Sequence, residues 1–259
     1  MSVHVDIQGK GSDLVLLHGW AMHGGVFADI ANTLAQQYRV HNIDLPGHGK
    51  SNADPRIKTL NQLTASIRPH VPTCAVVFGW SLGGQVALQL AATLPLQGLV
   101  LVSATPKFVA DASWPHGMAP AVFEQFFARL HANIETTVQD FLSLQVRGDV
   151  HAMHTLKALR MRLLQHPPDA AMLETALAML REMDLRPLLP TIRVPTLLIA
   201  GEHDRIAHPR ATQSTQALMP HAHYAEIKRA GHASFLSHRD EFMDTLNEFL
   251  ARLAGAGVA

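Results

Sequence analysis

The feature that most constrains this chain is the pentapeptide Gly79-Trp80-Ser81-Leu82-Gly83, which has the pattern Gly-x-Ser-x-Gly. The preceding run, Cys74 to Phe78, favours a strand, and the following run, Gln85 to Leu94, favours a helix. A turn this tight needs small flanking residues, because a Cβ at position 79 or 83 would collide with the neighbouring backbone. We therefore predict a nucleophile elbow, with Ser81 alone at its apex and its Oγ exposed at a helix N-terminus.

Segments with strand and helix character alternate on both sides of this motif. The run Leu14 to Leu17 is apolar throughout, as expected for a strand that is covered on both faces of a parallel sheet. Leu60, Leu63 and Ile67 recur at helical spacing. Further strands are expected at Tyr38–Ile43, Leu96–Ala104, Val194–Ala200 and Tyr224–Ile227. The alternation predicts the α/β class, with a mostly parallel central sheet.

The alternation stops between residues 108 and 189, where no convincing strand is found. The segment instead contains amphipathic runs separated by prolines and glycines. These runs are Ala121–Leu130, Thr136–Leu144, His151–Leu164 and Ala170–Leu180. We expect residues 1–107 and 190–259 to form the core domain and residues 108–189 to form a helical lid inserted into it.

Composition excludes several classes of protein. The 259 residues are 47% hydrophobic, which is ample for a core, and 21 Lys and Arg balance 21 Asp and Glu. This balance gives no reason to expect a nucleic acid or an anionic membrane as partner. The N-terminus lacks the features of a signal peptide, so we expect a cytoplasmic protein, and a monomer. The single cysteine, Cys74, is expected to be a small buried residue in a strand.

A serine nucleophile needs a base, and the base needs a buried carboxylate to orient it. His232 follows the last predicted strand, and Asp204 follows a fully apolar strand by a short turn. Both should therefore lie at the carboxyl edge of the sheet, where ligands bind in this class of fold. Glu202 is the competing carboxylate. The order Ser81, Asp204, His232 along the chain is one of the known orders of the serine triad.

The reaction also needs two N–H donors for the oxyanion. One should be the backbone N–H of Leu82, the residue after the nucleophile. The other should come from the loop after the first central strand, which reads His18-Gly19-Trp20, and we assign it to the N–H of Trp20. Gly19 would let this loop approach the elbow, and the Trp20 side chain would cover the acyl pocket. This chemistry requires no metal and no organic cofactor.

Several motifs together give a family resemblance that covers the whole chain. They are His18-Gly19-Trp20, Asp44-Leu45-Pro46-Gly47-His48-Gly49-Lys50-Ser51, Gly79-Trp80-Ser81-Leu82-Gly83-Gly84, Gly201-Glu202-His203-Asp204 and Gly231-His232-Ala233. With them the chain resembles an α/β-hydrolase. The resemblance implies the α/β-hydrolase fold and a serine hydrolase.

A narrower resemblance rests on His-Gly-Trp, Gly-Trp-Ser-Leu-Gly-Gly and the lid segment Phe141-Leu142-Ser143-Leu144-Gln145. With these motifs the chain is similar to the BioH family, the carboxylesterases of biotin biosynthesis that demethylate the methyl ester of pimeloyl-acyl-carrier protein. The resemblance implies an acyl-carrier protein as partner. It also implies a substrate site lined by Trp20, Ser81, Leu82, Phe141, Leu142, Ser143, Leu144, Gln145 and His232.

The lid departs from that family at one point. Lid arginines contact the acidic carrier in the family, but Asp140 precedes Phe141 here. Arg147, Lys157 and Arg160 remain as possible carrier contacts, with Lys157 and Arg160 on one outer helix face. A face of this kind would make binding dependent on salt, although a merely solvated helix surface would look the same.

Two alternatives remain open from the sequence. The first is a small-molecule member of the fold: a broad carboxylesterase, an enol-lactonase or a carbon–carbon bond hydrolase. The second is a ligand-binding module that retains the triad without turnover. A haloalkane dehalogenase is disfavoured, because its nucleophile would be an aspartate at the position of Ser81.

Overall fold

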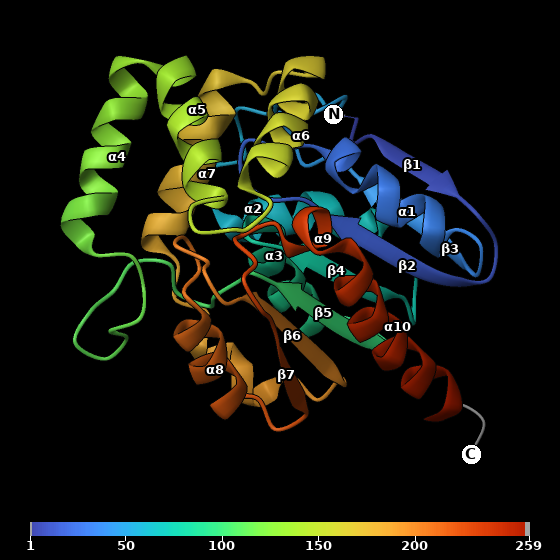
Figure 1. Ribbon diagram of the computed structural model, residues 1–259. Coiled ribbons are helices and arrows are strands. Elements are labelled where there is room, and N and C mark those ends of the chain that lie inside the picture. Colours follow the sequence, from blue (N-terminus) through green and yellow to red (C-terminus); the bar gives the residue numbers. More distant parts are fainter. Residues whose placement is uncertain (1, 257–259) are drawn as a thin grey trace.

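One sheet of seven strands forms the centre of the computed structural model, which describes residues 2–256 (Figure 1). The strand order is β1-β3-β2-β4-β5-β6-β7. Neighbouring strands are parallel except for β1 and β3, which are antiparallel. The strands are β1 (Val5–Gln8), β2 (Ser12–Leu17), β3 (Tyr38–Ile43), β4 (Val76–Trp80), β5 (Gly98–Val102), β6 (Thr196–Gly201) and β7 (Ala222–Ile227). The expected mostly parallel α/β sheet is confirmed.

Helices cover both faces of this sheet. In Figure 1, α1 and α10 lie in front of the sheet and α2 and α3 lie behind it. The helices of the core are α1 (Ala28–Leu34), α2 (Leu60–Ile67), α3 (Leu82–Ala91), α8 (Pro209–Ala217), α9 (Ser234–Ser237) and α10 (Arg239–Ala256). Short 3₁₀ helices are η1 (Gly24–Phe27), η2 (Arg68–His70) and η3 (Arg186–Thr191). Because both faces are covered, every residue of β4, β5 and β6 is buried.

Four helices gather over one end of the sheet (Figure 1). They are α4 (Pro120–Ala132), α5 (Ile134–Gln145), α6 (Ala152–Gln165) and α7 (Ala170–Glu182). The chain enters and leaves this group of helices at neighbouring points. An isolated antiparallel bridge pairs Lys107, which precedes α4, with Asp184, which follows α7. The domain boundaries at 107/108 and 189/190 stay a prediction. Of the predicted core, residues 1 and 257–259 lie outside the described part of the chain.

The prediction for Cys74 was wrong. The strand begins at Val76, and Cys74 is exposed in the turn before it, with φ at 59°. The amide N–H of Ala75 donates to Pro72 O at 3.3 Å, so the backbone still turns where a strand was expected. A proline two residues before Cys74 was the available signal. Elsewhere the expected elements are present with shifted ends. Among residues 2–256, no helix is long and apolar enough to cross a membrane.

Candidate active site

Ser81 occupies the turn between β4 and α3 in a backbone conformation that few residues adopt, with φ at 55° and ψ at −115°. For a residue with a Cβ this conformation is strained and persists only where the surroundings enforce it. Ser81 N donates to Val102 O at 3.0 Å, and Gly84 N donates to Ser81 O at 2.9 Å. The turn is thus fixed to β5 on one side and to its own helix on the other.

The glycines around Ser81 are required by close backbone contacts. A Cβ added to Gly79 would lie 2.4 Å from Gly83 O, and one added to Gly83 would lie 2.2 Å from Leu17 O. A Cβ on Gly19 would lie 3.2 Å from Ser81 Cβ. The elbow and the loop after β2 therefore touch through main chain, which brings the Gly19–Trp20 peptide beside the serine.

Asp204 and His232 meet at the carboxyl edge of the sheet, as the sequence led us to expect. His232 Nδ1 lies 2.8 Å from Asp204 Oδ2, and both side chains are fully buried. A carboxylate only accepts hydrogen bonds, so Nδ1 is the donor. The other oxygen of Asp204 accepts from Ile206 N at 2.8 Å and Ala207 N at 3.0 Å. These bonds fix the carboxylate and the tautomer of the imidazole.

The far nitrogen of the imidazole is free. His232 Nε2 is buried, and within residues 2–256 no hydrogen bond joins it to Ser81 or to any other group. Trp80, the residue before the serine, donates from Nε1 to His232 O at 2.9 Å, and the two rings lie 5.5 Å apart. The hydrogen-bonded line therefore runs from Asp204 to His232 and stops beside the elbow. Such bonds are often long in the free enzyme and tighten when substrate binds.

The competing carboxylate, Glu202, has other partners. It accepts from Arg229 N at 2.8 Å and from Lys228 Nζ at 3.4 Å. The amide of Arg229 holds the pKa of Glu202 below its ordinary value. Of the two carboxylates, only Asp204 contacts the His232 side chain.

Of the two expected oxyanion donors, Leu82 directly follows the serine, and Trp20 follows Gly19, which approaches Ser81 closely. Leu82 is the first residue of α3, so its N–H has no partner within the helix. The Trp20 side chain is 1% exposed, and its Nε1 donates to Leu173 O in α7 at 2.9 Å. This bond ties the loop of the core to the lid helices above it.

The lid segment 141–145 divides into inner and outer residues. Phe141 packs edge to face on Trp20, with ring centroids 4.9 Å apart, and Leu142 is fully buried. The backbone oxygen of Gln145 accepts from His232 N at 2.8 Å, while neither polar atom of its buried amide has a partner among residues 2–256. Ser143 is exposed, and its hydroxyl donates to Gln139 O of its own helix at 3.0 Å. Leu144 is half-buried.

Sequence reasoning missed Phe126 of α4. Its ring lies 5.7 Å from Trp20 and 5.8 Å from Phe141, which completes an aromatic cluster under the lid. An apolar residue on an amphipathic helix carries no signal for such a role.

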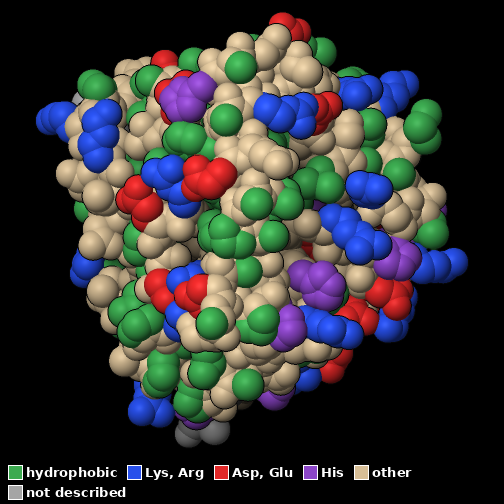
Figure 2. Space-filling view, turned by 90° about the vertical axis from the view of Figure 1, so that its left-hand side faces the viewer, with side chains coloured by type: hydrophobic (Ala, Val, Ile, Leu, Met, Phe, Trp, Pro, Cys, Tyr) green, Lys and Arg blue, Asp and Glu red, His purple; other side chains and the backbone are tan. Residues whose placement is uncertain are grey.

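The three possible carrier contacts are all exposed. Arg147 follows α5, while Lys157 and Arg160 lie on the outer face of α6. Asp140 pairs with Arg129 of α4 instead of facing solvent alone. A hollow of about 450 Å³ next to Leu144 is lined in part by His116, Arg205, His208 and Arg210. Figure 2 shows Lys, Arg and His side chains beside a hollow, with Asp and Glu side chains close by.

The loop after β2 also contains a buried neutral histidine. Leu45 N donates to His18 Nε2 at 2.9 Å, so Nδ1 carries the proton and donates to Gly19 O at 2.8 Å. Burial, reinforced by the neighbouring His48, lowers the pKa of His18 to about 3. His18 therefore links the loop of residues 44–51 to the oxyanion loop without carrying charge.

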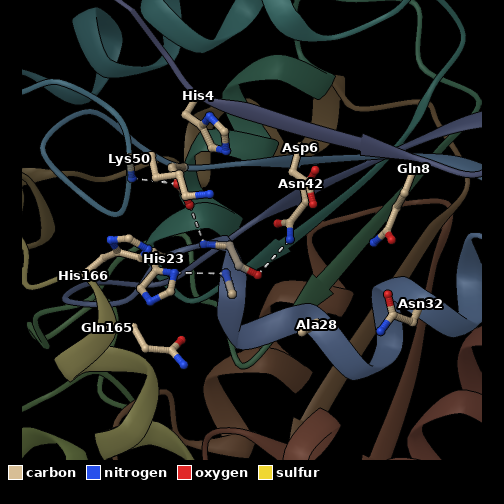
Figure 3. Close-up of a pocket in the computed structure, with 13 residues that line it drawn as sticks. His4, Asp6, Gln8, His23, Ala28, Asn32, Asn42, Lys50, Gln165 and His166 are labelled. Atoms are coloured by element: carbon tan, nitrogen blue, oxygen red, sulfur yellow. Dashed lines mark hydrogen bonds between the residues drawn. The ribbon is translucent and has the colours of Figure 1, made fainter.

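A polar pocket of about 280 Å³ lies apart from these residues (Figure 3). His23, His166 and Asn42 point into it, and no residue predicted to act in chemistry lines it. Gly25 N donates to His23 Nδ1 at 3.1 Å, so His23 Nε2 donates to Arg162 O of α6 at 2.8 Å. This pocket holds no nucleophile and base pair, but its histidine fastens the core to the lid.

Comparison with known proteins gives a consistent picture. Residues 14–245 match the profile of the alpha/beta hydrolase family. The chain is 46% identical over 257 residues to the pimeloyl-[acyl-carrier protein] methyl ester esterase of Stenotrophomonas maltophilia (strain K279a), covering 98% of both chains. It is 42% identical over 251 residues to the protein of the same name from Xanthomonas oryzae pv. oryzae (strain MAFF 311018), covering 96% of this chain and 99% of that one.

Solved structures share the fold at lower identity. An esterase (EaEST) from Exiguobacterium antarcticum superposes with a TM-score of 0.89 at 22% identity, covering 96% of this chain and 95% of that chain. The enol-lactonase from Burkholderia xenovorans LB400 gives a TM-score of 0.84 at 23% identity, covering 96% of both chains. At this identity the likeness concerns the fold alone.

Proposed function

The chain belongs to the alpha/beta hydrolase family, and on that premise we propose that it is a serine carboxylesterase that hydrolyses the methyl ester of pimeloyl-[acyl-carrier protein]. The products are pimeloyl-[acyl-carrier protein] and methanol, and the reaction belongs to biotin biosynthesis. Near full-length relatives at 42% to 46% identity bear that name. The observation in the molecule that carries the proposal is the buried pair of Asp204 and His232 beside the strained Ser81.

In the proposed mechanism Ser81 is the nucleophile, His232 the base and Asp204 the orienting carboxylate. His232 Nε2 takes the hydroxyl proton as Ser81 Oγ attacks the ester carbonyl, and then gives it to the departing methoxide. Methanol leaves and a pimeloyl ester of Ser81 remains. Water, deprotonated by the same nitrogen, attacks this acyl-enzyme, and the proton returns to Ser81 as the carboxylic acid is released. The buried Nε2 supports this role, because it makes no hydrogen bond to any group of residues 2–256.

We propose that the N–H groups of Leu82 and Trp20 stabilise the oxyanion. The close approach of Gly19 to Ser81 supports this assignment, since it brings the Trp20 amide to the side of the nucleophile. Losing one such donor typically costs about 2.7 to 4 kcal/mol of transition-state stabilisation. The strained elbow thus serves chemistry by exposing the hydroxyl and the Leu82 N–H on the same side.

We propose that the acyl chain lies between the elbow and the lid, against Trp20, Phe141, Leu142 and Leu144. The aromatic packing of Trp20 and Phe141 supports an apolar chain, and the unpartnered amide of Gln145 supports a polar group at one end. Ser143, which the resemblance also places in the substrate site, points to solvent and would reach substrate only through its backbone.

We propose that Arg147, Lys157 and Arg160 contact the carrier protein, which is acidic. Their exposure supports this role, and Arg205 and Arg210 add positive charge around the hollow beside Leu144, near the end of α5 that Arg147 follows. We further propose that the enzyme acts in the cytoplasm as a monomer. Size-exclusion chromatography that gives a mass near 28.3 kDa would agree with a monomer.

The decisive experiment for this function compares two methyl esters at low salt. Purified protein is given the methyl ester of pimeloyl-carrier protein and the dimethyl ester of free pimelate, and methanol release is followed. We expect a higher kcat/KM for the carrier-bound ester. Equal values would favour a broad carboxylesterase. Labelling by a fluorophosphonate without turnover of either ester would favour a ligand-binding module.

A further inference from the structure

The loop that carries His232 is attached to the turn between α5 and α6, residues 146–151. His232 N donates to Gln145 O at 2.8 Å, at the end of α5. Gly231 N donates to the carboxylate of Asp149 at 2.7 Å, a contact between residues 82 positions apart in sequence. Two consecutive amides of the core loop therefore bond to the lid.

The carboxylate of Asp149 is 1% exposed and has a defined partner on each side. Its Oδ2 accepts from Gly231 N, and its Oδ1 accepts from His151 N at 2.7 Å. His238 Nδ1 lies 4.0 Å from Oδ2. The bond to His151 is an ordinary local turn, since it spans two residues. The bond to Gly231 is different, because it crosses from the lid to the core.

Gly231 lies too close to Gln145 to be replaced by a residue with a side chain. A Cβ on Gly231 would lie 2.5 Å from Gln145 O and 3.5 Å from Asp149 Cβ. A buried carboxylate is costly unless it is hydrogen-bonded, so Asp149 holds the Gly231 amide firmly. The N–H that is held in this way belongs to the peptide bond between Ala230 and Gly231, one peptide before His232.

We propose that Asp149 is a positioning residue for the reaction. Its carboxylate fixes the main chain at Gly231 and thereby sets the imidazole of His232 against Ser81. Because Asp149 lies in the predicted lid, this additional hold on the base depends on the turn between α5 and α6 lying against the core. This inference rests on the proposed role of His232 as the base.

The test uses a small ester that needs no carrier. In Asp149→Ala, we expect kcat for p-nitrophenyl butyrate to fall about 10- to 100-fold while KM stays within about twofold, because a misplaced catalytic group can cost about 10²-fold. The rate of labelling of Ser81 by a fluorophosphonate should fall by the same factor. Asp149→Asn offers one acceptor oxygen for two N–H donors, so its kcat should lie between those of the alanine variant and the wild type, about three- to tenfold below the latter.

Asp169→Ala is the matched control. Asp169 is also a lid aspartate that accepts a backbone N–H, that of Met172 at 2.9 Å, at the start of α7. Within residues 2–256 it makes no hydrogen bond to the loop that carries His232. We expect this control to lose stability while keeping the wild-type kcat.

Three outcomes would overturn the positioning role. They are wild-type kcat in Asp149→Asn, wild-type kcat in a folded Asp149→Ala, and equal losses of kcat in Asp149→Ala and Asp169→Ala. The asparagine variant decides the matter if the alanine variant does not fold. Wild-type turnover by Ser81→Ala would be a different failure, because it would remove the proposed function itself.

Discussion

Buried polar side chains at the carboxyl edge of the sheet and in the lid differ in how far they are hydrogen-bonded, as Asp204 and Gln145 show. At the edge, both oxygens of Asp204 and one nitrogen of His232 are bonded to protein. In the lid, the buried amide of Gln145 has no partner among residues 2–256 at either polar atom. The pair of Asp204 and His232 is thus already bonded in the free protein, whereas the Gln145 amide is not. Preorganised groups at the reacting atoms support rate, and unpartnered groups in a pocket support selection of substrate.

The largest expected effect comes from removing the base at the carboxyl edge of the sheet. His232→Ala should lower kcat by about 10⁴- to 10⁶-fold, because the serine loses the group that accepts its proton. The measurement is the steady-state rate with p-nitrophenyl butyrate, with circular dichroism to show that the variant is folded. A loss below tenfold in a folded variant would mean that another group is the base.

Asp204→Asn tests whether the carboxylate orients the imidazole. An amide in this position can donate to the imidazole and favour the wrong tautomer, so kcat should fall by about 10⁴-fold with little change in KM. Glu202→Gln is the matched control, because Glu202 follows the same strand but bonds to Arg229 and Lys228. Equal losses in the two variants would contradict the assignment.

The lid predicts a trade between stability and activity at Gln145. Gln145→Leu replaces a buried amide that has no partner, so the free energy of unfolding should rise by about 1 kcal/mol. The same change should lower kcat/KM for the pimeloyl ester about tenfold if the amide binds substrate. Urea unfolding and ester hydrolysis measure the two effects. A variant with unchanged stability and unchanged kcat/KM would remove Gln145 from the account.

Acid should lower the free energy of unfolding through the buried His18, in the loop after β2. The pKa of His18 is lowered to about 3 by burial, while an unfolded histidine titrates near 6.5. Between these two pH values the unfolded state therefore binds one proton more at His18 than the folded state does. The contribution of neutral His18 to the free energy of unfolding is fully present above pH 6.5 and is lost as the pH falls toward 3. Between pH 6 and 4, the free energy of unfolding of His18→Gln should fall less steeply with decreasing pH than that of the wild type, by up to about 1.4 kcal/mol per pH unit.

The control for His18 is His154→Gln, which changes an exposed histidine on α6. It should leave the dependence of unfolding free energy on pH as in the wild type. The same flattening in both variants would show that the buried histidine is not the cause.

The smallest expected effect concerns the outer face of the lid. Lys157→Gln combined with Arg160→Gln should lower kcat/KM for the carrier-bound ester a few-fold and reduce its dependence on salt. The ratio of the carrier-bound to the free ester is the quantity to report. A ratio that equals the wild-type value at low salt would mean that the carrier does not bind at Lys157 and Arg160. Arg205 and Arg210, beside the hollow next to Leu144, would then be the next residues to substitute.

The sequence predicted the edge far better than the lid. Ser81 and Asp204 could be chosen because each follows a strongly apolar strand, and His232 because it lies in the loop after the last predicted strand; parallel strands bring their ends together. The bond from Gly231 to Asp149 and the packing of Phe126 on Trp20 could not be predicted, since they depend on how the lid helices dock. The prediction that Cys74 is buried in a strand failed for a local reason. The turn that begins at Pro72 extends through Cys74 and overrides the strand propensity there.

The most direct test of the central claim is to trap the acyl-enzyme. The protein is mixed with the methyl ester of pimeloyl-carrier protein, quenched in acid and digested, and the peptides are analysed by mass spectrometry. We expect methanol release together with an acyl adduct on the peptide that contains Ser81, and neither in Ser81→Ala. Release of methanol by Ser81→Ala at the wild-type rate would contradict the account.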